Sequence, residues 1–350
     1  MDVRAPAVIK LFGEHAVVYG KTAVAMAVDL YAGASAEGAG RLSIALPDIG
    51  KSATLPDEDL HRIYGAFSSR ESIGGFISGQ GMDRDLLPFA SIAAALSSRH
   101  GARLDYEVTV TSDIPVQKGL ASSAACSTAF LAALVKAKGL SLPDGEFMEL
   151  ARIGEMVQHA NENSGFIDVS TSYYGGFVSF SAGSARRQRV PKPLSLLLVD
   201  TGPKKKTSEM VEAVRSRYES DPVQTIAILD EIDSCGIKGI EALGSDSPDR
   251  LEKLGSLMYD NQESLARLGV SSGSLDTAVR LARVGGAYGA KLSGGGGGGM
   301  AVILPRGNPD PLKKALEGSG FHVSEITTSF SGARDFMQSG AKPAATGCPT

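Results

Sequence analysis

The stretch Ile114-Pro-Val-Gln-Lys-Gly-Leu-Ala-Ser-Ser-Ala-Ala125 carries the strongest local signal in the sequence, because it joins a turn to the start of a helix. Its proline and glycine favour a loop, and residues 122–137 are almost all small or helix-forming. Ser122 or Ser123 is the candidate N-cap of that helix. Small side chains let a ligand approach the backbone, and free N–H groups at a helix N-terminus suit a phosphate. The stretch therefore predicts a phosphate-binding loop, with an ordinary capped, alanine-rich helix as the alternative.

Strand-like and helix-like patterns alternate on both sides of this loop, without an internal repeat. Apolar and polar residues alternate over 104–110, which predicts a half-buried strand. The apolar run 7–18 predicts a strand that breaks into a loop at Gly13. The other expected helices cover residues 89–100, 145–161, 207–218, 222–232, 247–268 and 273–284, and the other strands cover 177–180, 194–199 and 300–304. This pattern is typical of an α+β protein in two halves.

The length of 350 residues suggests roughly two domains. The charged, proline-bearing segment 184–193 is the best candidate for the boundary between them. We therefore expect an N-terminal domain over residues 1–185 and a C-terminal domain over 186–340. The tail 341–350 is rich in Ala, Gly, Pro and Thr, and we expect it to fray.

The composition excludes several classes of protein. Hydrophobic residues make up 43% and charged residues 21%, which fits a globular chain with a sizeable core and excludes wholesale disorder. A net charge of −4 argues against a mainly electrostatic nucleic-acid binder. The sequence has no apolar run of about 18 residues, no signal-peptide pattern, and no cysteine spacing typical of disulfides or zinc. We expect a soluble, cytoplasmic protein with neither a nucleic-acid nor a membrane partner.

A run of six glycines at residues 294–299 is the second loop that could contact a ligand. Ordering six glycines costs conformational entropy, so a chain rarely keeps them between ordered elements without a use. Flexible linkers usually mix glycine with serine and lie between domains. The run therefore favours a backbone surface for a ligand over a flexible linker.

Two charged residues lie within apolar stretches. Lys10 interrupts what otherwise reads as a buried strand, and Asp168 lies between apolar residues in a segment read as a strand leading into a loop. Buried charges are costly unless they are paired or bind a ligand, and a Lys–Asp pair at a cleft is a common active-site device. A purely structural ion pair is the alternative. Glu155 reads as part of a solvated helix face or as a metal ligand, and His159 reads as structural.

Three segments of the chain, in this order, resemble motifs of the GHMP kinases. They are the stretch Leu11-Phe-Gly-Glu-His-Ala-Val-Val-Tyr-Gly20, the predicted phosphate-binding loop 114–125 and the glycine run 294–299. This superfamily includes galactokinases, homoserine kinases, mevalonate kinases and phosphomevalonate kinases. The first motif is most similar to the mevalonate kinase branch, as are residues 200–207 and 258–271. The resemblance covers about residues 4–335.

The resemblance implies a two-domain α+β fold, with an N-terminal half like domain 2 of ribosomal protein S5 and a ferredoxin-like C-terminal half. The active site would lie in the cleft between them. The family transfers the γ-phosphoryl group of ATP to a substrate hydroxyl with Mg²⁺. For this chain the implied acceptor is mevalonate, in isoprenoid biosynthesis, so ATP and mevalonate are the expected partners. A homodimer is left open.

The same resemblance assigns roles to individual residues. Asp168 would contact the accepting hydroxyl and Lys10 would stabilise its anion, and both are expected to be catalytic. The phosphates would be bound by Lys118, Gly119, Leu120, Ala121, Ser122, Ser123, Ala124, Gly295, Gly296 and Gly297. Ser123 and Glu155 would hold Mg²⁺. Glu14, His15 and Thr207 would face mevalonate.

The chain departs from the usual family pattern in two places. The family usually reads Ala-Pro-Gly-Lys near its start, whereas here Val8 holds the lysine position and the lysine is Lys10. Side chains alternate along a strand, so Lys10 would share a face with Val8, about 7 Å farther along. Glu155 and Asp168 are 13 residues apart, two more than usual.

Two alternative functions remain open from the sequence. The stretches Ala7-Val-Ile-Lys10 and Gly119-Leu-Ala-Ser-Ser123 also resemble the diphosphomevalonate decarboxylases of the same superfamily. The first alternative is therefore another isoprenoid-pathway enzyme, either a phosphomevalonate kinase or this decarboxylase. The second is a catalytically inactive nucleotide or metabolite sensor on the same fold, which only the displaced lysine favours.

Overall fold

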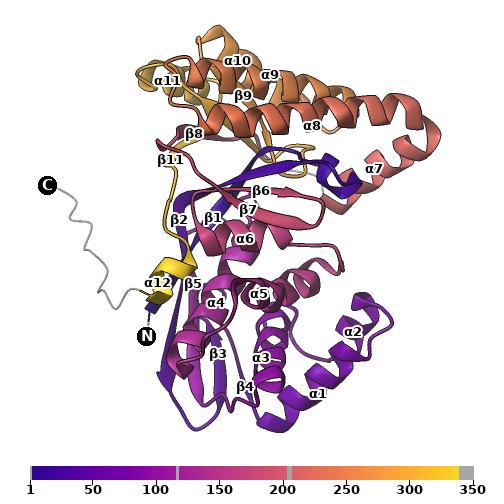
Figure 1. Cartoon of the computed structure of the whole chain (residues 1–350), viewed down its shortest axis with the longest axis vertical. Helices are drawn as coiled ribbons and strands as arrows, with labels where there is room; N and C mark the ends of the chain where they lie inside the picture. The colour runs from indigo at the N-terminus through magenta and orange to yellow at the C-terminus, as the bar shows by residue number, and fades with distance from the viewer. Residues whose placement is uncertain (1, 116–117, 203–206, 339–350) are drawn as a thin grey trace, which may run out of the picture.

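The computed structural model describes residues 2–115, 118–202 and 207–338, which form two lobes that each carry one sheet (Figure 1). Within these residues the first sheet has seven strands: β1 pairs with β2, and the others follow the order β4-β3-β5-β2-β6-β7. Only β3 and β5 pair in parallel within this described sheet. The strands are β1 (Asp2–Phe12), β2 (Ala23–Gly38), β3 (Leu42–Leu46), β4 (Lys51–Leu55), β5 (Tyr106–Ser112), β6 (Phe177–Ser181) and β7 (Ser184–Gln188).

The long strand β2 organises this sheet. One of its edges pairs with β1, and the other pairs with β6 through residues 23–26 and with β5 through residues 32–38. Residues 23–28 are all buried, so this half of β2 is covered on both faces. The register between β1 and β2 shifts between Lys10 and Phe12, close to the point where the chain leaves the sheet. Such irregularities re-aim side chains at the end of a strand.

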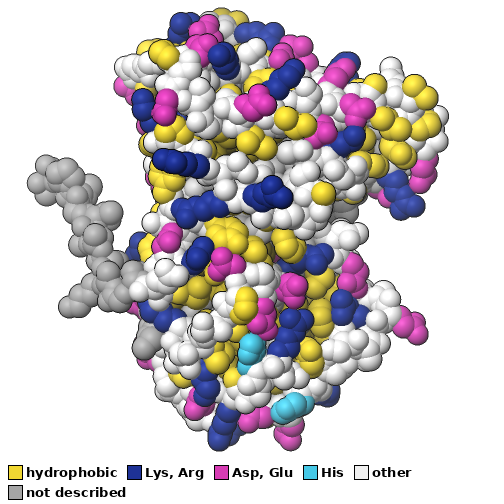
Figure 2. All heavy atoms as spheres, viewed as in Figure 1, with side chains coloured by type: hydrophobic (Ala, Val, Ile, Leu, Met, Phe, Trp, Pro, Cys, Tyr) yellow, Lys and Arg dark blue, Asp and Glu magenta, His cyan; other side chains and the backbone are white. Residues whose placement is uncertain are grey.

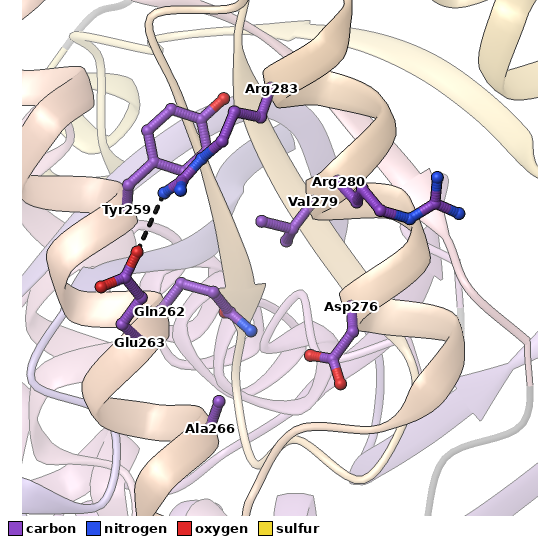
Figure 3. Close-up of a pocket in the computed structure, with 8 residues that line it drawn as sticks. All are labelled: Tyr259, Gln262, Glu263, Ala266, Asp276, Val279, Arg280 and Arg283. Carbon is purple, nitrogen blue, oxygen red and sulfur yellow. Dashed lines mark hydrogen bonds and ion pairs between the residues drawn. The ribbon is translucent and has the colours of Figure 1, made fainter.

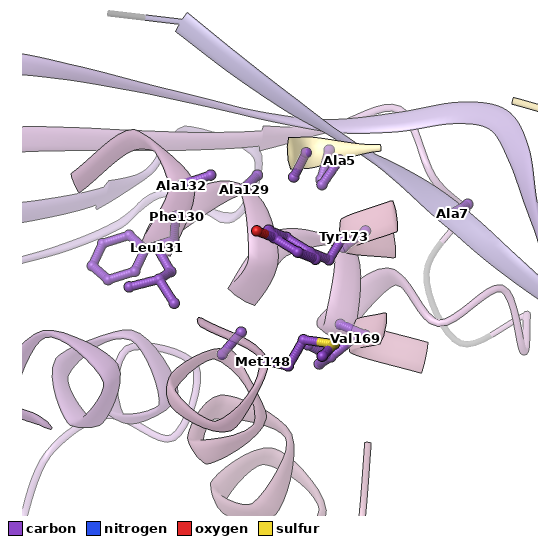
Figure 4. Packing of buried hydrophobic residues seen from close by; sticks show 14 of the residues in the cluster. Ala5, Ala7, Ala129, Phe130, Leu131, Ala132, Met148, Val169 and Tyr173 are labelled. Carbon is purple, nitrogen blue, oxygen red and sulfur yellow. The ribbon is translucent and has the colours of Figure 1, made fainter. Parts of the chain in front are cut away.

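Six helices of the described N-terminal lobe pack on or beside this sheet: α1 (Asp57–Ser68), α2 (Ile73–Gly79), α3 (Leu87–His100), α4 (Ser122–Lys138), α5 (Asp144–His159) and α6 (Phe166–Tyr174). The alanine-rich helix α4 contacts β1, β2, α5 and α6. Its small side chains, such as Ala129 and Ala132, let it approach Ala5 of β1 and Tyr173 of α6 closely (Figure 4). This close packing holds the start of α4 near the end of β1, where the candidate site lies.

The second lobe contains a four-stranded antiparallel sheet in the order β11-β8-β10-β9. Its described elements are β8 (Ser195–Asp200), α7 (Thr207–Ser220), α8 (Pro222–Gly244), α9 (Arg250–Leu268), α10 (Gly273–Val284), β9 (Gly289–Ser293), β10 (Met300–Leu304), α11 (Asp310–Gly318) and β11 (His322–Thr327). Strand, helices, two strands, helix and strand in this order form the ferredoxin-like arrangement. The expected α+β architecture with a ferredoxin-like second half is confirmed.

The boundary expected between residues 185 and 186 falls inside β7, which pairs with β6 at the edge of the first sheet. We therefore propose to place the boundary after Gln188. The chain also returns to the first lobe at its other end, where Thr328 bridges to Val28 and α12 (Ala333–Gln338) packs against α4 and β1. Residues 329–338 thus belong with the first lobe, although we expected them in the second. The tail expected to fray lies outside the described residues.

Two other expectations about local structure are wrong. Neither Ser122 nor Ser123 is the N-cap of α4, because Ala121 holds that position with a left-handed backbone (φ 51°). Asp168 lies in the first turn of helix α6 rather than at the end of a strand.

Helix α8 is much longer than the expected 222–232. It continues through Gly239, where an added Cβ would lie 2.5 Å from the ring of Phe12. This glycine allows a helix of the second lobe to approach the end of β1 in the first.

None of the described helices is long and apolar enough to span a bilayer. Cys126 and Cys235 are free thiols, and burial raises the pKa of each to about 11. Such thiols are largely inert at neutral pH. The third cysteine, Cys348, lies outside the described residues.

Candidate active site

Lys10 and Asp168 form an ion pair where β1 meets the first turn of α6. The Lys10 ammonium donates to both carboxylate oxygens of Asp168, at 2.6 and 2.8 Å. Both side chains are mostly buried, with 23% and 15% of their surface exposed. An acidic residue in the first turn of a helix is also stabilised by the helix dipole. The pair therefore holds an oriented carboxylate that still reaches solvent.

The pair lies at the junction of the two lobes. Ser293 at the end of β9 accepts a hydrogen bond from the Lys10 backbone N–H at 3.1 Å, and its hydroxyl lies 3.3 Å from the Lys10 carbonyl oxygen. On the same strand face as Lys10, Val8 is buried beside Ile167, the residue before Asp168. The strand-phase argument from the sequence, which put Lys10 and Val8 on one face, agrees with this packing.

The loop before α4 approaches the pair through its backbone. The carbonyl oxygen of Leu120 accepts a hydrogen bond from the Val8 N–H at 3.0 Å, and the Leu120 side chain is buried in the core. Among the described residues no side chain caps α4, so Ser122, Ser123 and Ala124 present first-turn N–H groups without a capping acceptor. An anion such as a phosphate would satisfy these groups.

Lys118 contributes a cation to the same loop. Its ammonium donates to Asp200 at the end of β8, in the second lobe, and the Gly202 N–H donates to the other oxygen of that carboxylate at 3.0 Å. Burial by itself raises the pKa of Asp200, but the hydrogen bonds from Lys118 and Gly202 outweigh it and lower the pKa overall. The ion pair therefore links the two lobes beside the loop.

The glycine run 294–299 is an ordered loop between β9 and β10. Five of its glycines have positive φ, namely Gly294, Gly296, Gly297, Gly298 and Gly299. The Gly297 N–H donates to the Val270 carbonyl at 2.8 Å, and the Gly299 carbonyl accepts from both the N–H and the hydroxyl of Thr201. These bonds contradict the flexible-linker alternative.

The glycine run touches the other predicted site segments. An added Cβ at Gly294 would lie 3.7 Å from the Gly119 carbonyl oxygen, and one at Gly295 would lie 3.0 Å from Thr207 Cγ2. The Gly295 carbonyl oxygen is 2.9 Å from His15 Nε2. Both loops predicted from the sequence, together with His15 and Thr207, therefore meet in one place.

His15 and Glu14 are held by the turn after β1. His15 has a left-handed backbone (φ 62°) and is buried, and this burial lowers the pKa of its ring although the Gly295 carbonyl and the Glu14 charge oppose the shift. Glu14, which was expected to face mevalonate, forms a fully buried ion pair with Lys291 of β9. Its Oε2 has no hydrogen-bond partner within the described chain.

Lys291 was not among the residues predicted from the sequence. Its ammonium also donates to the Leu292 carbonyl at 2.6 Å, and burial lowers its pKa against the opposing charge of Glu14. Every residue of β9 is buried, so Lys291 is a lone charge in an apolar strand. The argument that singled out Lys10 could have found Lys291 by the same signal.

Ser123 and Glu155, the expected metal ligands, lie on either side of His159. The ring Nε2 of His159 is 3.4 Å from the Ser123 hydroxyl and 3.5 Å from Glu155 Oε2. The interaction with Glu155 raises the pKa of His159. Glu155 is 2% exposed, and its Oε1 has no partner among the described residues. A buried carboxylate oxygen without a partner, next to a hydroxyl, fits a small divalent cation.

The described residues contain no group of three or more His, Cys, Asp or Glu side chains placed to hold a metal. A pocket of about 260 Å³ between α9 and α10 is lined by residues such as Tyr259, Asp276 and Arg283 and includes none of the predicted site residues (Figure 3).

The chain belongs to the GHMP kinase family. The model of the GHMP kinases N terminal domain matches residues 89–176, and that of the GHMP kinases C terminal domain matches residues 240–321. The sequence is 34% identical to the mevalonate kinase of Pyrococcus horikoshii, in an alignment that covers 90% of this chain and 92% of that relative.

Solved structures give the same result. A crystal structure of a mevalonate kinase matches with a TM-score of 0.76 and 26% identity, covering 94% of this chain and 99% of the other. The L. major mevalonate kinase in complex with R-mevalonate matches with a TM-score of 0.72 and 24% identity, over 95% and 97% of the two chains. The fold and family expected from the three motifs are confirmed.

Proposed function

We propose that this chain is a mevalonate kinase, which transfers the γ-phosphoryl group of ATP to the 5-hydroxyl of (R)-mevalonate and yields 5-phosphomevalonate and ADP. The Lys10–Asp168 pair at the junction of the lobes is the observation that carries this proposal. It stands beside the two loops whose backbone suits phosphates. The mevalonate kinases among the relatives of the chain identify the acceptor class.

Asp168 has the chemistry that the acceptor hydroxyl needs. A carboxylate within hydrogen-bond distance of a hydroxyl can orient it and accept its proton as the O–P bond forms. Lys10 orients that carboxylate through two short hydrogen bonds. Lys10 also places positive charge beside the position where negative charge is transferred.

The remaining residues would bind and position the substrates. First-turn N–H groups of α4, the Lys118 ammonium and the Gly295–Gly297 backbone would bind the ATP phosphates. His15 and Thr207 would face mevalonate, and Glu14 would act indirectly by fixing β9 through Lys291. Most of the rate enhancement would then come from positioning and charge stabilisation.

The residues present fit Mg²⁺, which we propose as the cofactor. Ser123 and Glu155 offer oxygen donors of the kind Mg²⁺ prefers, and Glu155 Oε1 is buried without another partner among the described residues. When bound with ATP, Mg²⁺ neutralises charge on the phosphate oxygens. Gly165 leaves room for the Glu155 side chain, since a Cβ at Gly165 would lie 2.3 Å from the Glu155 Cβ.

The experiment is an ADP-release assay with mevalonate, 5-phosphomevalonate and 5-diphosphomevalonate as separate acceptors, with products identified by ³¹P NMR. Turnover confined to mevalonate is the expected result. Turnover of 5-phosphomevalonate alone would support the phosphomevalonate kinase alternative. Release of carbon dioxide from 5-diphosphomevalonate would support the decarboxylase. Absence of turnover with all three, by a chain that binds ATP, would support the inactive sensor.

We further propose a cytoplasmic homodimer. Val223 and Ile226, near the start of α8, are 80% and 40% exposed, and Figure 2 shows hydrophobic side chains gathered over this outer end of the second lobe. Sedimentation equilibrium should show a dimer that dissociates when Val223 and Ile226 are both changed to Ser. A wild-type chain that remains monomeric at all concentrations would contradict the homodimer.

A further inference from the structure

His159 brings a nitrogen donor to the proposed cation site. It lies one helical turn after Glu155 on α5, so the two side chains share a face of the helix. Ser123 reaches the same point from the second position of α4. The ring Nε2 faces both oxygen donors, at 3.4 Å from the Ser123 hydroxyl and 3.5 Å from Glu155 Oε2.

These distances are long for hydrogen bonds and suitable for shared metal coordination. N–H···O hydrogen bonds are usually about 2.7–3.2 Å long. Two donors that each lie about 2.1 Å from one cation are about 3.0 Å apart at adjacent octahedral positions and about 3.4 Å apart in a tetrahedron. The spacing in this chain therefore allows one cation to contact Nε2 and both oxygens after a shift of a few tenths of an ångström.

The carboxylate that completes this group is held in place and is not fully satisfied. Gly165, with φ 88°, passes so close to Glu155 that any side chain there would displace it. Glu155 is buried, and its Oε1 has no partner within the described chain. His159 is 52% exposed on its side chain, so it can turn toward a cation without repacking the core.

We propose that His159 is a direct ligand of the divalent cation that accompanies ATP, and that it shifts the preference of the site from Mg²⁺ toward Co²⁺ and Mn²⁺. Mg²⁺ favours oxygen donors, whereas imidazole nitrogen favours first-row transition metals. This inference rests on the proposed function, because it extends the Ser123–Glu155 site. The described residues supply only two carboxylate or imidazole ligands here, so the nucleotide phosphates complete the coordination and the cation binds with the nucleotide.

The test is pulsed electron paramagnetic resonance of Mn²⁺ with ADP on the whole chain. Protein with unlabelled histidine should show modulation from a directly bound ¹⁴N nucleus, and protein grown with ¹⁵N-histidine should lose it. His159→Gln should also lose it. His61→Gln is the matched control, because His61 is exposed on α1 and its ring forms a hydrogen bond with the Asp57 carbonyl, and this variant should keep the modulation.

Affinity gives a second readout. The ratio of the Kd of Mg²⁺·ADP to that of Co²⁺·ADP, measured by calorimetry, should fall by about tenfold or more in His159→Gln and stay constant in His61→Gln. Bound Mn²⁺·ADP without histidine nitrogen coupling would overturn the inference, even if mevalonate is phosphorylated. Coupling without turnover of mevalonate would support the ligand and overturn the proposed function. Failure of Mn²⁺·ADP to bind at all would overturn both.

Discussion

Replacing Lys10 with Met removes the cation beside Asp168 and keeps a side chain of similar length. Two hydrogen bonds of 2.6 and 2.8 Å are lost, and each hydrogen bond to a charged group contributes about 1.5–3 kcal/mol. Both side chains reach solvent, so we take the lower end of this energy range for each hydrogen bond, which gives about 3 kcal/mol for the two together. If Lys10 stabilises the transition state by this much more than it stabilises the ground state, kcat should fall on the order of 10²-fold.

The assay is steady-state ADP release with saturating mevalonate, together with single-turnover kinetics to isolate the chemical step. The Kd for ATP should change little, because Lys10 lies beside Asp168 rather than in the first turn of α4. Lys313→Met is the matched control, since Lys313 of α11 forms a surface ion pair with Glu325 of β11 in the second lobe. Its kcat should equal that of the wild type.

A companion variant tests the position of the lysine. Moving it to the usual family position, as Val8→Lys with Lys10→Ile, should restore little activity. Val8 is 1% exposed and packs beside Ile167, so a lysine there would be buried without a prepared partner. A folded Lys10→Met protein with kcat within about threefold of the wild type, a change of less than about 1 kcal/mol, would refute the catalytic role of Lys10.

Three further predictions concern the surrounding structure. Gly296→Val should raise KM for ATP or lower kcat, because a Cβ there would lie 2.1 Å from the Val270 carbonyl oxygen; unchanged values of both would argue against a phosphate role for this loop. Lys291→Met should lower the free energy of unfolding in urea by about 3–5 kcal/mol, because it leaves Glu14 buried and unpaired, and a loss below about 1 kcal/mol would contradict this reading. Burial lowers the pKa of His15, so the unfolded chain binds more protons than the folded one between that lowered pKa and about 6.5, and the free energy of unfolding should fall as the pH falls through this window. An NMR titration of the His15 ring with a midpoint at or above 6.5 would contradict the last prediction.

The elements that could be predicted from the sequence carry strong local patterns. The alternation over 104–110 and the small residues of 122–137 gave β5 and α4 to within two residues, because strand periodicity and helix propensity act over short distances. The glycine run was recognised as ordered for an energetic reason, and its positive φ angles and hydrogen bonds agree with that reason.

Other elements depend on contacts that are distant in sequence. Helix α8 runs to Gly244, well past the predicted end at residue 232, and Gly239 lets it approach Phe12. The return of α12 to the first lobe depends on pairing with β2 near Val28, which no local pattern indicates. Such long-range packing depends on which surfaces are buried in the whole molecule, so it is hard to predict from a single sequence.

In the candidate site, too, the residues with a local sequence signal could be predicted, whereas the contacts between distant segments could not. Lys10 and Asp168 were singled out because each is a charge in an apolar stretch, and the structure brings them into contact across 158 positions of sequence. Glu14 was assigned to the substrate because its motif suggested it, but Lys291, on a distant strand, holds it. The sequence predicts a structural His159, whereas the structure places its ring between Ser123 at the start of α4 and Glu155 of α5.

The central claim is that Asp168 acts on the acceptor hydroxyl of mevalonate. The most direct measurement is the single-turnover rate of mevalonate phosphorylation by Asp168→Asn, with ATP binding measured on the same sample. We expect the rate to fall by at least about 10²-fold while the Kd for ATP stays within about threefold, because the carboxylate contributes to the transition state rather than to nucleotide binding. A folded Asp168→Asn protein that phosphorylates mevalonate at a rate close to that of the wild type would contradict the claim.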